Sequence, residues 1–191
     1  MVLAERAGFP KGLMNIVTGR TTEIGAEITS NPIVRKVTFT GSTPVGKQLM
    51  AECAGTVKRT SMELGGNAPF IVFDDANIDA AVQGAMVSKY RNAGQTCVCS
   101  NRLIIQSGIY DEFVAKLTDA VKGLNVGDGA EEGVAVGPLI DDKAAKGVLD
   151  FIDDAVAKGA TIITGGGRSM LGGSFIDPTI LTNVTRNMRV F

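Results

Sequence analysis

The sequence contains no histidine, and only three of its 191 residues are cysteine. Without histidine, a Ser–His or Cys–His pair of nucleophile and base is impossible within this chain, and so is a zinc site with histidine ligands. Three cysteines are too few for a four-thiolate metal site or a disulfide-stabilised scaffold. Acid–base chemistry here must therefore use carboxylates, lysine, tyrosine or thiols, and we expect no metal site.

Charge and hydrophobicity argue against two further classes of protein. The net charge is -1, and no cluster of lysine and arginine provides a footprint for nucleic acid. Apolar runs such as Phe70–Phe73 are far too short to cross a bilayer, and the first residues lack the pattern of a secretory signal. We therefore expect a cytosolic protein that binds neither nucleic acid nor membrane.

Segments with strand and helix patterns alternate along the chain. Many of the 24 glycines lie at the breaks between them. This alternation predicts an α/β fold with a largely parallel sheet. The expected strands are 14–17, 34–40, 57–62, 70–73, 103–105 and 161–163, and the expected helices are 24–29, 44–54, 78–91, 110–124 and 143–158.

A change of character near Gly65-Gly66 marks the expected boundary between two domains. The first domain is predicted to span residues 1–64 and the second 65–191. An Asp-rich turn is expected to cap the helix at 78–91, and Ser42 or Thr43 the helix at 44–54.

Cys97 is the candidate nucleophile because it follows a helix end and a glycine in the run RNAGQTC. Loops held by rigid elements often display reactive groups, and a thiol is the best side-chain nucleophile near neutral pH. A buried structural cysteine is the alternative that the spacing alone leaves open.

Glu63 is the candidate general base. It lies between apolar residues at a strand end and precedes two glycines, so partial desolvation is expected to tune it toward a base. The alternative is an ordinary solvated glutamate.

Gly41 and Ser42 form a strand-to-helix turn in the run FTGST. A glycine lets a ligand approach the backbone, and the following helix N-terminus offers free N–H groups to a phosphate. The run is not a GxGxxG or P-loop fingerprint, so an ordinary turn is the alternative.

Taken together, the runs FTGST, ELGGNAP and RNAGQTC, in this order, resemble the aldehyde dehydrogenase superfamily. FPKGLMNIVTG and NPIVRKVTFTGS upstream, and VGPLID and GGSFIDPTIL downstream, extend the resemblance over essentially the whole chain. Within the family, SMELGGNAPFIVFDDANIDAAV and RNAGQTCVCSNR are most similar to succinate-semialdehyde dehydrogenases.

The resemblance implies the second part of a Rossmann-type NAD(P)-binding domain, followed by most of an α/β catalytic domain. It implies that the Cys97 thiolate attacks an aldehyde and that hydride passes to NAD or NADP. Glu63 then activates the water that hydrolyses the thioester. It also places Gly41, Ser42 and Leu64 beside the cofactor and makes the Cys97 amide half of an oxyanion hole.

Two further side chains gain roles from the resemblance. Arg91 resembles the arginine that holds the distal carboxylate of succinate semialdehyde, with Gln95 as a wall of the pocket. A cation that stabilises the helix C-terminus is the alternative for Arg91. Cys99 is a candidate redox partner, because a Cys97–Cys99 disulfide would consume the nucleophile reversibly; small core filler is its alternative.

The resemblance begins and ends in mid-protein. We expect the rest of the cofactor domain, with the second oxyanion donor, upstream, and a ribose-binding glutamate and an oligomerisation segment downstream. The alternatives to succinate semialdehyde as the substrate are another short aldehyde or a catalytically inactive fragment. Complete family members are homo-oligomers.

Overall fold

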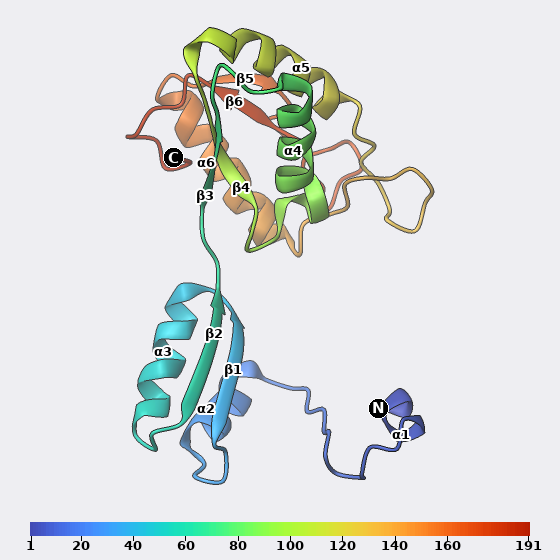
Figure 1. The fold of residues 1–191 in the computed structure, drawn as a ribbon, viewed down its shortest axis with the longest axis vertical. Coiled ribbons are helices and arrows are strands. Elements are labelled where there is room, and N and C mark those ends of the chain that lie inside the picture. Colours follow the sequence, from blue (N-terminus) through green and yellow to red (C-terminus); the bar gives the residue numbers. More distant parts are fainter. The chain divides into compact units, whose positions relative to one another are not determined.

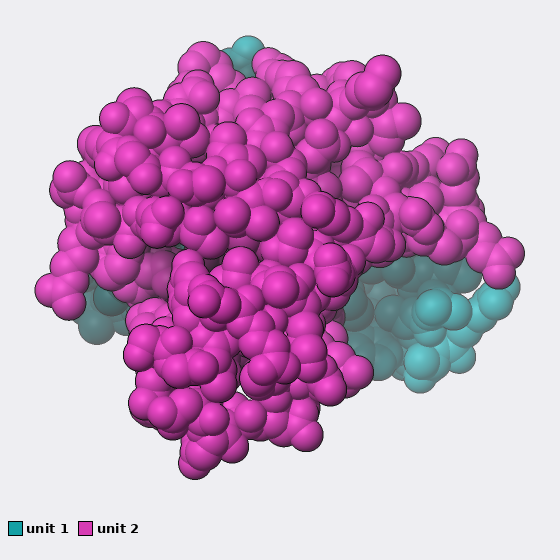
Figure 2. Space-filling model, turned by 90° about the horizontal axis from the view of Figure 1, so that it is seen from above, with its two compact units in different colours: residues 1–65 teal, residues 66–191 magenta.

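The computed structural model describes residues 1–191 as two compact units, Met1–Gly65 and Gly66–Phe191 (Figures 1 and 2). The division falls beside the predicted boundary at residues 64 and 65. That the units correspond to a cofactor domain and a catalytic domain stays a prediction at this point.

The first unit is built around two parallel strands and the helix that connects them. Strand β1 pairs with β2 along its whole length, so that Thr40 lies opposite Glu63 and Gly41 opposite Leu64. Parallel strands need such a crossover, and here it supplies the helical layer (Figure 1). The elements are α1 (Val2–Arg6), α2 (Thr21–Ser30), β1 (Lys36–Gly41), α3 (Thr43–Ala54) and β2 (Arg59–Leu64).

Buried polar contacts fasten α2 to the rest of this unit. The Lys58 ammonium donates to the carbonyl oxygens of Asn31, at 2.7 Å, and Val34, at 3.1 Å. The Thr29 hydroxyl, buried on α2, donates to the Glu52 carboxylate of α3 at 2.9 Å. A lysine this buried is tolerated because its ammonium is hydrogen-bonded, and it fixes the loop that leads into β1.

The prediction of a buried strand at residues 14–17 is wrong. This segment has no regular secondary structure, and its side chains are exposed, Ile16 by 74%. A strand needs a partner for its backbone groups, and β1 pairs only with β2 in this unit. Apolar composition alone therefore misled the prediction here.

The second unit has a parallel strand pair with two helices on one face. β3 pairs with β4, and α4 and α5 pack against each other and around the largest core cluster. The buried members of this core are Val72, Val82, Ala85, Phe113, Leu117 and Val121. The elements are β3 (Ala68–Val72), α4 (Ile78–Tyr90), η1 (Arg91–Gly94), β4 (Ser100–Ile105), η2 (Ser107–Ile109) and α5 (Tyr110–Lys122).

The last part of the chain adds a helix and an antiparallel pair, α6 (Asp142–Ala157), β5 (Thr161–Thr164) and β6 (Ile180–Thr182). The prediction of a largely parallel arrangement therefore holds for β1–β2 and β3–β4 but not for β5–β6. No helix is both long enough and apolar enough to span a membrane.

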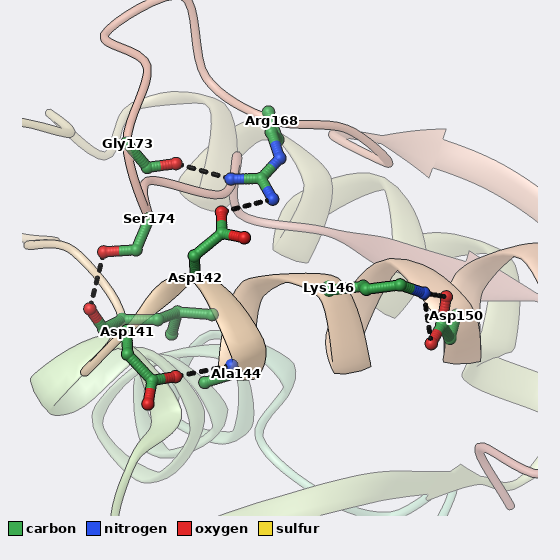
Figure 3. Close-up of polar contacts among 9 residues, drawn as sticks. Asp141, Asp142, Ala144, Lys146, Asp150, Arg168, Gly173 and Ser174 are labelled. Atoms are coloured by element: carbon green, nitrogen blue, oxygen red, sulfur yellow. Dashed lines mark hydrogen bonds and ion pairs between the residues drawn. The ribbon is translucent and has the colours of Figure 1, made fainter.

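The residues that cap the helices differ in part from those predicted from the sequence. Asn77, and not the Asp-rich turn before it, caps α4 by accepting from the Ala80 amide at 3.0 Å. Ser42 occupies the N-cap position of α3, but its side chain makes no capping hydrogen bond. Asp141 caps α6 by accepting from the Ala144 amide at 2.7 Å (Figure 3). Short polar side chains compete for such positions, and only local geometry decides among them.

Phe113 is expected to be the main packing residue of the second unit, because it is 1% exposed at the centre of the core. Phe113→Ala should lower the free energy of unfolding by about 3–5 kcal/mol. Both tyrosines, Tyr90 and Tyr110, lie in this unit, so tyrosine fluorescence during urea denaturation reports on it alone. Phe73→Ala is the matched control, since Phe73 is 62% exposed. Equal losses for the two variants would contradict the assigned core.

Candidate active site

Cys97 lies in the turn between α4 and β4, and its side chain is exposed. The chain enters this turn through an unusual backbone. Asn92 and Ala93 both adopt the left-handed conformation, with φ of 53° and 54°, and Gly94 follows at 75°. Two successive non-glycine residues in this region cost about 1–2 kcal/mol each, so the surrounding contacts must hold them there.

Hydrogen bonds between Asn92 and Gln95 close the turn. The Asn92 carbonyl accepts from the Gln95 amide at 3.1 Å and from the Gln95 side chain at 3.3 Å. The Asn92 side chain in turn donates to the Gln95 carbonyl at 3.2 Å. These three bonds offset part of the backbone strain and fix the loop two residues before the nucleophile.

Gly94 is required at its position for two reasons. Its positive φ disfavours a side chain, and an added Cβ would lie 3.0 Å from both the ammonium and the carbonyl oxygen of Lys89. The turn therefore packs directly on the last turn of α4.

Cys99 is buried, at 2% exposure, whereas Cys97 is exposed. Its thiol donates to the Lys89 carbonyl at 3.5 Å and lies 3.7 Å from the Lys89 ammonium. Burial, with a further contribution from Cys99, raises the pKa of the neighbouring Tyr90. Cys97 and Cys99 are both free thiols, so a disulfide between them stays a prediction and would require this turn to rearrange.

Arg91 lines an open hollow of about 540 Å³ beside the nucleophile turn. One wall is the outer face of α4, with Gln83, Val87 and Ser88, and the other includes Thr96 and Val98, which flank Cys97. The lining of this hollow thus includes Arg91 and both neighbours of Cys97, although not Cys97 itself. Arg91 is exposed, so its role in substrate binding stays a prediction.

The other predicted residues gather at the carboxyl ends of β1 and β2 in the first unit. Glu63 and Leu64 end β2, Gly41 ends β1, and Ser42 precedes α3. Because Ser42 makes no capping bond, the Thr43 and Val45 amides at the start of the 12-residue helix α3 remain available to an anion, whereas Pro44 between them has no N–H. This edge therefore fits a dinucleotide phosphate, in the position that parallel βαβ units use.

Two details here differ from the sequence-based predictions. Glu63 is exposed, so the expected partial desolvation is wrong for this unit, in which β2 is an edge strand. The place that a Gly41 side chain would occupy is filled by the Phe39 ring, 2.4 Å from an added Cβ. Internal packing is therefore a second reason for glycine here, beside the approach of a ligand that we expected.

The predictions from sequence missed two contributors to these sites. Gly46, buried on α3, brings the helix against Leu64, whose Cδ2 would lie 2.6 Å from an added Cβ. The sequence did contain a signal for this close contact, namely a glycine about one turn after the expected start of the helix. Gln95 was expected to line the pocket, but its side chain instead hydrogen-bonds to the Pro138 carbonyl and the Ile140 amide. No group of three or more candidate metal ligands occurs in the chain.

Comparison with known proteins identifies this arrangement. The sequence profile of the aldehyde dehydrogenase family matches residues 1–191. The chain belongs to the aldehyde dehydrogenase family. The family match confirms the resemblance that the sequence motifs predicted, whereas the roles of Cys97 and Glu63 stay predictions.

Among curated relatives, the glutarate-semialdehyde dehydrogenase of Pseudomonas aeruginosa is 63% identical over 188 residues, covering 98% of this chain and 39% of that protein. The 3-sulfolactaldehyde dehydrogenase of Pseudomonas putida is 60% identical over 190 residues, covering 100% and 39%. The crystal structure of succinate-semialdehyde dehydrogenase from Burkholderia pseudomallei superimposes with a TM-score of 0.97 at 59% identity, covering 99% and 39%. The chain thus spans about 39% of the length of these relatives.

The strain in the nucleophile turn predicts a substitution that stabilises the chain. Ala93→Gly should raise the free energy of unfolding of the second unit by about 0.5–1 kcal/mol, because glycine adopts positive φ without the Cβ penalty. Ala115→Gly is the control, since Ala115 is exposed inside α5, where glycine should cost about 0.5–1 kcal/mol. Urea denaturation followed by tyrosine fluorescence measures both. A loss of stability in both variants would contradict the strained turn.

Proposed function

We propose that this chain supplies the nucleophile and the general base of an NAD(P)-dependent aldehyde dehydrogenase. The substrate is a short aldehyde with an anionic group at its far end, and the product is the carboxylic acid. Succinate semialdehyde, oxidised to succinate, is the substrate we favour. The observation that carries the proposal is the hollow that Arg91 shares with the two residues flanking Cys97.

Cys97 performs the covalent step. Its thiolate attacks the aldehyde carbon, a carbon–sulfur bond forms, and the carbonyl oxygen takes up a proton to give a thiohemiacetal. The Cys97 amide is proposed to donate to that oxygen while it carries negative charge. An exposed thiol in a rigid turn suits this role, because the sulfur is accessible and its direction is fixed.

The thiohemiacetal carbon becomes the carbonyl of a thioester as its hydride leaves and its hydroxyl proton is lost to solvent; the hydride acceptor would be supplied by a bound nicotinamide dinucleotide. The residues proposed to hold it are Gly41, Ser42 and Leu64 at the edge formed by β1 and β2. The Thr43 and Val45 amides at the start of α3 are proposed to bind a phosphate of this cofactor, and Leu64 is proposed to contact its nicotinamide end.

Glu63 is the proposed general base of the hydrolytic step. Its carboxylate takes a proton from water, the water oxygen attacks the thioester carbon, and the carbon–sulfur bond breaks to release the acid and the Cys97 thiol. A carboxylate suits this role in a chain without histidine. Its place at a strand end, before two glycines, leaves the side chain free to reach solvent.

Arg91 is proposed to select the substrate by its anionic end. A guanidinium binds a carboxylate through two parallel hydrogen bonds, and it also binds a sulfonate. The names of the three relatives fit this class, since succinate semialdehyde, glutarate semialdehyde and 3-sulfolactaldehyde each carry an aldehyde and an anion. Glutarate semialdehyde is the second candidate, favoured by the 63% identity to the Pseudomonas aeruginosa enzyme.

We also propose that the protein is a cytosolic homo-oligomer.

Turnover tests the proposal directly. The purified protein is mixed with succinate semialdehyde and NAD or NADP, and the absorbance of the reduced nicotinamide is followed. Cys97→Ala should lower the rate at least about a thousandfold, and Glu63→Gln about a hundredfold or more. Cys53→Ala is the control, because Cys53 is buried in α3 and takes no part in the chemistry. Undiminished turnover in Cys97→Ala would refute the assignment.

Arg91→Ala tests the substrate class. It should raise KM for succinate semialdehyde about 10–100-fold, because a charged hydrogen-bonded pair contributes about 1.5–3 kcal/mol. KM for butanal, which has the same carbon chain without the carboxylate, should change little. Arg91→Lys keeps the charge but loses the paired geometry, so its effect should be intermediate. Equal increases for both aldehydes would show that Arg91 only stabilises the end of α4.

A further inference from the structure

The side chain of Gln95 ties the nucleophile turn to a segment more than forty residues later in the sequence. Its Oε1 accepts from the Ile140 amide at 2.9 Å, and its Nε2 lies 3.4 Å from the Pro138 carbonyl oxygen, to which it donates. The same Nε2 lies 3.3 Å from the Asn92 carbonyl oxygen. One amide group therefore joins the strained backbone of the turn to residues 138–140.

The segment that Gln95 grips is itself fixed on its other side. Leu139 and Ser174 exchange two hydrogen bonds, from the Leu139 amide to the Ser174 carbonyl at 3.0 Å and from the Ser174 hydroxyl to the Leu139 carbonyl at 2.7 Å. Just beyond, Arg168 pairs with Asp142 at 2.6 Å and also donates to the Gly173 carbonyl (Figure 3). Residues 138–140, to which Gln95 is hydrogen-bonded, are therefore themselves held by further hydrogen bonds and lie beside an ion pair.

Two features of the turn disfavour its conformation, and the hydrogen bonds of Gln95 oppose both. Asn92 and Ala93 hold a disfavoured left-handed conformation, and the apolar side chain of Val98 is 70% exposed to solvent. Cys97 lies between these two sources of instability. Whatever restrains the turn also restrains the direction of the sulfur.

We infer that Gln95 is a positioning residue that fixes Cys97 for attack by fastening the nucleophile turn to residues 138–140. It acts through the backbone and does not touch the reacting atoms. Its meaning for catalysis rests on the proposed function, in which Cys97 is the nucleophile. In that reaction, loss of Gln95 lowers kcat and leaves KM for the aldehyde nearly unchanged, because Arg91 still holds the far end of the substrate.

The experiment measures the mobility of Cys97 without turnover. Cys97 is exposed whereas Cys53 and Cys99 are buried, so a thiol-specific nitroxide label attaches to Cys97 under native conditions, and Cys97→Ser confirms the site. In Gln95→Met, which keeps the length of the side chain but not its hydrogen bonds, the rotational correlation time of the label should fall at least about twofold.

Gln106→Met is the matched control. Gln106 is an exposed glutamine just after β4 that also makes two side-chain hydrogen bonds, both to Asp74, at 3.0 and 2.8 Å. Its loss should cost similar stability and leave the label unchanged. An unchanged label in Gln95→Met, or equal increases in mobility in both variants, overturns the inference.

Ser174→Ala keeps the test decisive if Gln95→Met fails to fold. It removes the hydroxyl bond to Leu139 without altering the turn, and a smaller increase in label mobility is expected; an unchanged label in this case overturns the inference. The mobility requires neither aldehyde nor cofactor. If the label mobilities are as expected but the protein oxidises no aldehyde, the positioning role is supported and only the proposed function is refuted.

Discussion

The hydrogen bonds between Asn92 and Gln95 are the interaction on which the candidate active site depends. They close a turn whose backbone is strained at two consecutive residues, and this turn presents Cys97 to solvent while Cys99 stays buried. The turn begins at the end of α4, whose inner face belongs to the main core. Packing thus fixes the start of the turn, and hydrogen bonds fix its path, which leaves the thiol accessible but held in one direction.

The fold was predictable from sequence wherever a segment carries its own pattern. The spacing of Phe113, Leu117 and Val121 on one face of α5 depends on local chemistry alone, and the structure buries all three. Strand β5 was expected at residues 161–163, but the prediction for residues 14–17 was wrong and β6 was missed, for a shared physical reason. A strand forms only where a second strand pairs with it. A short run of apolar residues shows neither that Ile16 lacks such a partner nor that β6 runs antiparallel to β5.

The site was predictable in its residue types but not in its supports. Cys97 and Glu63 stand out because a chain without histidine leaves few other side chains for nucleophile and base, and the resemblance to the family suggests their roles and that of Arg91. Gln95 looked like a pocket wall, because its partners at residues 138–140 are backbone atoms of a distant segment. Gly46 went unremarked since its closeness to Leu64 depends on how α3 packs on β2. Such supports arise from tertiary packing, which local patterns do not encode.

The central claim, that Cys97 forms the covalent bond with the aldehyde, is tested most directly by isolating that bond. Glu63→Gln protein is incubated with succinate semialdehyde and oxidised nicotinamide cofactor, quenched in acid, digested and examined by mass spectrometry. Because the hydrolytic step is slowed while the thiol is intact, the account predicts a succinyl group on the peptide that contains Cys97. A folded Glu63→Gln sample with Cys97 unmodified, or with the succinyl group on another residue, would contradict it.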